Sequence, residues 1–175
     1  MLQIFKSIKE ISANNLELGG LSLVIDSKSE SQTSTGADIA FQVAVDNRIP
    51  IVYFSLESSR TEDVILRELL TILFSRYAEN NGEFATATLK NWEKVKGGIV
   101  TLSKAPLFIA DSISSEEPIR VMNTMLKNII SDRKVRLVII DSVRLLEEEN
   151  PIEHLEDMAN DLNVAIIAIR SNIQE

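Results

Sequence analysis

The strongest constraint on the fold is a regular alternation of short apolar runs with longer helical stretches, which begins after Gly19-Gly20. Several runs are apolar at every position, as expected for strands that helices cover on both faces. This alternation predicts an α/β fold of three layers, with a mainly parallel central sheet flanked by helices. The predicted strands are residues 21–25, 51–54, 107–110, 135–140 and 164–169, and the predicted helices span about residues 35–46, 60–77, 89–102, 116–132 and 151–162.

We expect residues 1–18 to form an amphipathic amino-terminal helix or linker, and residues 19–175 to form a single domain. The length of 175 residues and an apolar content of 45% suit one substantial core. Residues 80–87 are the one stretch with the composition of a loop. The apolar residues at helical spacing in the first segment are Leu2, Phe5, Ile8 and Ile11.

Two of the predicted helices carry start signals. Ser59 and Glu62 have the spacing of a capping box, in which two side chains satisfy backbone N–H groups of the first turn. Asn150 is a favourable cap residue and precedes Pro151, which suits the first helical turn. We therefore expect helices to begin at these two places.

Composition excludes several classes of function. The chain has no cysteine, and its one histidine is His154, so disulfide frameworks and Cys/His zinc sites are not possible. The net charge of -8 opposes autonomous DNA binding, which needs clustered Lys and Arg. No apolar run approaches the roughly 18 residues that cross a bilayer, and the first residues lack the pattern of a signal peptide, so we expect none. We expect a soluble, cytoplasmic protein that does not enter membranes.

The carboxyl ends of parallel strands are where such folds bind ligands. The predicted second strand leads to Glu57, and the fourth ends at Asp141. On residue type alone, a carboxylate at a strand end is more often a loop residue or a helix cap than a catalytic group. A catalytic role for either carboxylate therefore depends on the sequence segments around it.

Four segments carry a specific resemblance: PIVYFSLESS, KAPLFIADSIS, VRLVIIDSVRLL and DLNVAIIAIRS. Their order and spacing resemble the C-terminal RecA-like ATPase domain of DnaB-type replicative DNA helicases, which implies a RecA-like P-loop NTPase fold. The resemblance implies that Glu57 activates the attacking water and that Asp141 helps to hold magnesium. Carboxylates suit both roles, because phosphoryl transfer depends on positioning and charge stabilisation.

The loop after the first predicted strand departs from that family. A phosphate-binding loop G-x-x-x-x-G-K-S/T needs glycines whose N–H groups wrap the phosphates and a lysine that neutralises them. Counted back from FSLE, these positions fall on Ser27, Gln32, Thr33 and Ser34, and only Ser34 matches. No lysine occurs between Lys28 and Lys90. Lys28, Gln32, Thr33 and Ser34 are thus the nucleotide-binding candidates of a degenerate loop, and Ser34 and Asp141 would hold magnesium only if nucleotide binds.

Other departures agree with this interpretation. Ser171 stands where the family has a polar sensor, usually glutamine. The resemblance places an arginine finger and a second basic residue beyond residue 175, so we expect a domain that is truncated relative to the full helicase motor core. An acidic segment, residues 147–149, replaces a longer loop that faces the DNA channel in the family.

We therefore expect an inactive homologue of an ATP-dependent DNA helicase, without a cofactor, that works as a protein-interaction or regulatory module. Its partner would be a replication or recombination component, and it would be a monomer or dimer rather than a hexamer. The alternative is a divergent but active ATPase or helicase subunit that uses Glu57 and Asp141 with ATP and magnesium. It would borrow a cation from Lys28, Arg60, Arg144 or a partner chain. A third possibility is a regulatory relative of other RecA-like proteins, such as circadian-clock or recombinase-type ATPases.

Overall fold

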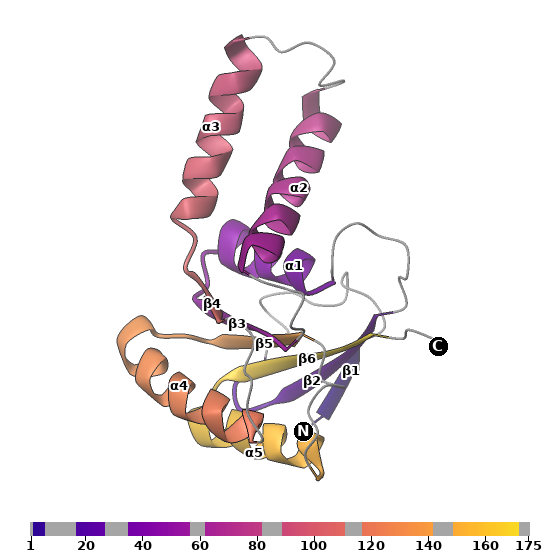
Figure 1. Ribbon diagram of the computed structural model, residues 1–175, viewed down its shortest axis with the longest axis vertical. Helices are drawn as coiled ribbons and strands as arrows, with labels where there is room; N and C mark the ends of the chain where they lie inside the picture. The colour runs from indigo at the N-terminus through magenta and orange to yellow at the C-terminus, as the bar shows by residue number, and fades with distance from the viewer. Residues whose placement is uncertain are drawn as a thin grey trace.

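The computed structural model describes residues 2–5, 17–26, 35–56, 62–81, 89–110, 117–141 and 149–171. These residues form one sheet in the order β1-β2-β6-β5-β3-β4, with every neighbouring pair parallel (Figure 1). The α/β class and the parallel sheet are therefore confirmed. The strands are β1 (Leu2–Phe5), β2 (Leu21–Asp26), β3 (Ile51–Ser55), β4 (Leu107–Ala110), β5 (Leu137–Asp141) and β6 (Ala165–Ser171). The helices are α1 (Thr35–Ala40), the π-helix η2 (Phe41–Asp46), α2 (Glu62–Asn81), α3 (Leu89–Ser103), α4 (Pro118–Arg133) and α5 (Pro151–Leu162).

Helices cover both faces of the sheet, because alternate strand residues point to opposite sides. On one face, Tyr53 and Ile139 pack in a core shared with α1, η2 and α2. On the other face, Phe54 and Ile140 pack in a core shared with α4 and α5. Apolar side chains are thus needed at every position of the central strands, which explains the unbroken apolar runs. Beyond the first core, α2 and α3 form a helical hairpin that extends away from the sheet (Figure 1).

The expectation of a helix at the amino terminus is wrong for Leu2–Phe5. This segment is β1, and it pairs in parallel with β2, with Leu2 opposite Leu21 and Phe5 opposite Val24. Four residues with apolar side chains at three positions fit either period, so the pattern alone could not decide. The edge of β2 that faces away from β6 offers backbone groups that a strand can satisfy and a helix cannot. The remainder of the predicted helix, residues 6–16, lies outside the described residues.

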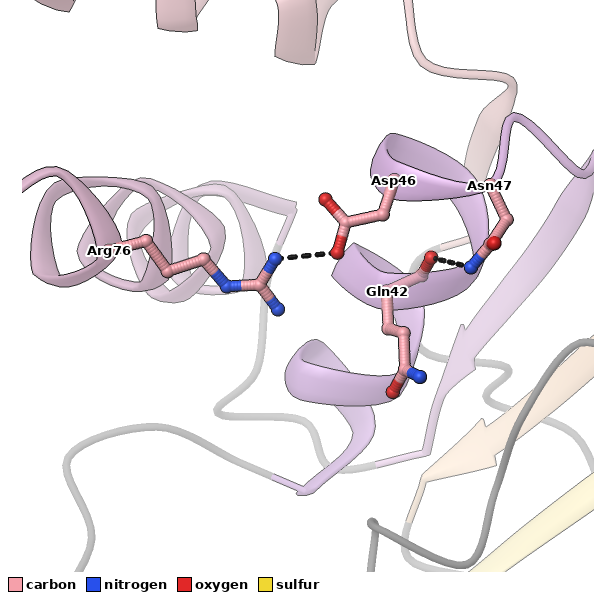
Figure 2. A network of polar contacts seen from close by, with 4 residues as sticks. All are labelled: Gln42, Asp46, Asn47 and Arg76. Carbon is pink, nitrogen blue, oxygen red and sulfur yellow. Dashed lines mark hydrogen bonds and ion pairs between the residues drawn. The ribbon is translucent and has the colours of Figure 1, made fainter. Parts of the chain in front are cut away.

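The helix predicted over residues 35–46 is present, but its second half is wound as a π-helix. At its end, the backbone N–H and the side-chain Nδ2 of Asn47 both donate to the carbonyl oxygen of Gln42, at 3.2 and 2.6 Å (Figure 2). Arg76 of α2 pairs with Asp46 at 2.5 Å (Figure 2) and lies over the ring of Phe41, 4.4 Å from its centroid. These contacts attach η2 to α2 and hold the helix layer on this face together.

The predicted helix starts have different outcomes. α5 begins at Pro151, as predicted, but Asn150 makes no side-chain capping bond and has a left-handed backbone, with φ of 55°. Asn150 as a side-chain cap is therefore wrong. A capping side chain requires an extended backbone at its own residue, whereas asparagine also tolerates the left-handed region adopted here. α2 begins at Glu62, and Ser59 lies outside the described residues.

In the part of the chain that the structure describes, no helix is long and apolar enough to cross a membrane.

Candidate functional site

The carboxyl ends of the central strands meet at one edge of the sheet. Ser55, the last residue of β3, lies opposite Asp141, the last residue of β5. Asp26, the last residue of β2, lies opposite Ser171 of β6. The parallel topology therefore gathers polar residues from distant parts of the sequence at the edge where an open α/β sheet binds its ligands.

Asp141 is almost fully buried, with 4% of its surface exposed. Its Oδ2 accepts a hydrogen bond of 2.5 Å from the hydroxyl of Tyr53, which is fully buried. Tyr53 lies two residues before the end of β3 and on the face that α1 covers. A hydroxyl that donates to a carboxylate forms one of the shorter and stronger hydrogen bonds in proteins. The bond joins β3 to β5 and uses one oxygen of the carboxylate that the resemblance assigns to magnesium.

Gly36, in the first turn of α1, lies directly against the Tyr53 ring. A Cβ atom added at Gly36 would stand 2.4 Å from the Tyr53 hydroxyl oxygen and 3.0 Å from two ring carbons. Real Cβ atoms do not approach another heavy atom so closely. The Tyr53 side chain therefore occupies the space below the start of α1, and this close approach requires glycine at residue 36.

Ser55 is another buried polar residue at this edge. Its side chain is 1% exposed, and its Oγ has no hydrogen-bond partner among the described residues. Such a buried hydroxyl carries a cost, because it has lost water without gaining another partner. We refer to Gly36, Tyr53, Ser55 and Asp141 as the carboxyl-edge cluster.

The structure places only part of the predicted site. Asp141 lies at the carboxyl end of β5, as predicted. Glu57 and the loop candidates Lys28, Gln32, Thr33 and Ser34 lie outside the described residues, so their roles stay predictions.

Sequence reasoning missed Tyr53. It is the one residue with a polar group in the apolar run of residues 51–54, and buried tyrosines usually find a hydrogen-bond partner for the hydroxyl. That signal could have identified Tyr53 as a residue with a polar neighbour, although not which neighbour. The contact between Gly36 and Tyr53 depends on the tertiary structure, so no local pattern indicates it.

A parallel sheet in this strand order, with helices on both faces, defines a RecA-like P-loop NTPase fold. Residues 12–172 match the family described as the DnaB-like helicase C terminal domain. The chain belongs to this family.

Individual relatives agree with that assignment. The replicative DNA helicase DnaB of Synechocystis sp. is 24% identical over 165 residues, and that of Treponema pallidum is 21% identical over 152 residues. The two alignments cover 88% and 81% of this chain but 18% and 34% of the relatives. The chain thus spans about a third or less of the length of these curated relatives.

Two solved structures share the fold. One comes from a study of a DnaB-like replicative helicase and its interactions with primase, with a TM-score of 0.60, 21% identity, and coverage of 89% of this chain and 39% of that chain. The other is the ATPase domain of another protein, with a TM-score of 0.60, 20% identity, and coverage of 86% of this chain and 56% of that chain. At these identities the likeness concerns the fold alone.

The family resemblance implies ATP and magnesium, and the described residues can be compared with that requirement. A magnesium ion bound directly by Asp141 Oδ2 would share this oxygen with the Tyr53 hydroxyl, which lies 2.5 Å from it. The loop that precedes α1 offers neither a lysine after Lys28 nor a glycine before Gly36. The residue types of this loop thus do not match the phosphate-binding motif.

Proposed function

We propose that this chain is a DnaB-like domain of DNA replication that does not hydrolyse ATP and acts as a protein-interaction or regulatory module. The observation that carries the proposal is the loop between β2 and α1, where Ser27, Gln32 and Thr33 occupy the glycine and lysine positions of the phosphate-binding motif. Without a lysine and a glycine cradle, a triphosphate loses charge-assisted hydrogen bonds that each stabilise by about 1.5–3 kcal/mol.

Titration calorimetry with magnesium and a non-hydrolysable ATP analogue tests this proposal. We expect no detectable heat up to millimolar nucleotide, and no hydrolysis above background, because neither loop cation nor loop glycines are present. The control is a DnaB relative with an intact motif, measured under the same conditions. Micromolar binding, or hydrolysis that Glu57→Gln abolishes, would favour the alternative of an active ATPase subunit that uses Glu57 and Asp141.

We propose a replication component as the protein partner. One structural neighbour is a DnaB-like helicase studied with primase, which makes a primase the first partner to test. The α2–α3 hairpin of this chain exposes apolar side chains, among them Leu66 and Ile99, and both line a cavity of about 320 Å³. Exposed apolar groups that gather around a hollow are typical of protein-interaction surfaces.

Oligomeric state gives a second measurement. We expect a monomer or dimer in sedimentation velocity experiments, with or without nucleotide, because a ring that hydrolyses no ATP gains nothing from shared active sites. Titration of the same sample with primase should then produce a faster-sedimenting complex. A hexamer that forms from this chain alone would contradict the expectation and point toward the motor alternative.

A further inference from the structure

We propose that Tyr53 is a positioning residue that makes Asp141 a structural anchor of the fold. The inference rests on the proposed function, since it explains how the carboxylate is used in a domain without hydrolysis. It concerns the Tyr53–Asp141 hydrogen bond, which neither the loop sequence nor the family membership predicts.

Tyr53 and Asp141 are both buried. Tyr53 is fully buried and Asp141 is 4% exposed, so neither polar group can rely on bulk water. A buried carboxylate is costly unless donors surround it. The Tyr53 hydroxyl provides such a donor at 2.5 Å. We therefore expect removal of either partner to destabilise the fold by leaving the other without this hydrogen bond.

The Tyr53 ring is fixed in place by its close approach to Gly36. Because the Tyr53 hydroxyl oxygen lies 2.4 Å from where a Cβ of residue 36 would be, the ring is held closely between the sheet and α1. The hydroxyl thus reaches Asp141 from a fixed place, without the entropy loss that a mobile surface side chain would suffer on forming the bond. One side chain thus links β3, β5 and the start of α1.

The Ser55 hydroxyl lies at the same edge of the sheet but makes no hydrogen bond with a described residue. Ser55 lies opposite Asp141 in the register, yet its Oγ has no partner among the described residues. The neighbouring serine therefore does not hold the Asp141 carboxylate in the described structure, and the Tyr53 hydroxyl donates to it instead. Substitution of Ser55 by alanine is a matched control, because it removes a buried hydroxyl at the same edge without removing a described hydrogen bond.

A double-mutant cycle in urea unfolding tests the inference. Tyr53→Phe should lower the folding equilibrium constant about tenfold in the wild-type background and less than about twofold in Asp141→Ala, a coupling typical of a buried hydrogen-bonded pair. In an Asp141→Asn background, which keeps an acceptor, the effect of Tyr53→Phe should lie between these two values. This background replaces Asp141→Ala if Asp141→Ala does not fold. Ser55→Ala should show no coupling with Tyr53→Phe. Equal effects of Tyr53→Phe in both backgrounds would overturn the inference.

Two further readouts separate a hydrogen bond from simple packing. With Tyr77→Phe, Tyr53 is the chain's one tyrosine, and its ring Cζ chemical shift should change on Asp141→Asn while Ser55→Ala leaves it unchanged. Millimolar magnesium, compared with EDTA, should leave the unfolding midpoint of the wild type unchanged. A midpoint shift that Asp141→Asn abolishes would overturn the inference. These unfolding experiments use no nucleotide. ATP hydrolysis in the separate nucleotide assay would therefore refute the proposed function without altering the measured coupling between Tyr53 and Asp141.

Discussion

Gly36→Ala is expected to destabilise the domain by about 3 kcal/mol, which combines overpacking of about 1–3 kcal/mol with loss of a charge-assisted hydrogen bond. The new methyl group would stand 2.4 Å from the Tyr53 hydroxyl oxygen, so the ring must move and release Asp141. Tyr53 is held between the sheet and α1, so it cannot move without disturbing the core. Chemical unfolding of wild type and variant measures the difference in free energy.

A Tyr53→Phe background provides the control for this prediction. In this background the Tyr53 hydroxyl oxygen, the atom closest to the new methyl group, is absent. Gly36→Ala should then cost less than about 1 kcal/mol, because alanine favours the helix over glycine by about 0.5–1 kcal/mol. Gly97→Ala in α3 is the matched substitution, since a Cβ there meets nothing within 4 Å, and it should stabilise slightly. If Gly36→Ala costs no more than Gly97→Ala, Tyr53 does not occupy the space below α1.

Restoring the phosphate-binding motif should have the largest effect on ligand binding. The variant Ser27→Gly, Gln32→Gly, Thr33→Lys, with Ser34 retained, recreates the full motif in the loop before α1. We expect its dissociation constant for ATP to fall from about 1 mM or weaker to about 1 μM, a gain of about 4 kcal/mol. The physical reason is that backbone N–H groups and a lysine together replace the water that the phosphates lose.

A variant with both new glycines but Thr33 unchanged is the control for loop flexibility, and it should bind nucleotide no better than wild type by calorimetry. If the full motif also fails to bind, the loop sequence is not the cause of weak binding, and the arrangement of Tyr53 and Asp141 becomes the better explanation. Adding Tyr53→Phe to the restored variant distinguishes these cases, because it releases the Asp141 carboxylate.

Much of the fold could be predicted from the sequence because strands buried on both faces leave an unmistakable pattern. The run of residues 137–141 is apolar up to Asp141, and the strand ends at that residue, where the chain reaches the polar edge of the sheet. The start of α5 at Pro151 followed from the geometry of proline itself. These features depend on local chemistry, which the sequence states directly.

Other features could not be predicted because they depend on neighbours far away in the chain. The segment Leu2–Phe5 fits a helix or a strand, and only the free edge of β2 selects the strand. Asn150 looks like a side-chain cap, yet the connection into α5 gives it a left-handed backbone that makes no such bond. The π-helical winding of Phe41–Asp46 likewise has no signal in its composition.

The sequence by itself determined the class of the domain, its parallel sheet and the lack of any lysine between Lys28 and Lys90, because apolar periodicity and residue identity need no partner to be recognised. Only the tertiary structure decided what Asp141 contacts. Tyr53 and Asp141 are 88 residues apart in the chain, and the parallel pairing of β3 with β5 brings their side chains to 2.5 Å. A hydrogen bond of this kind is a property of the assembled sheet, and no local pattern contains it.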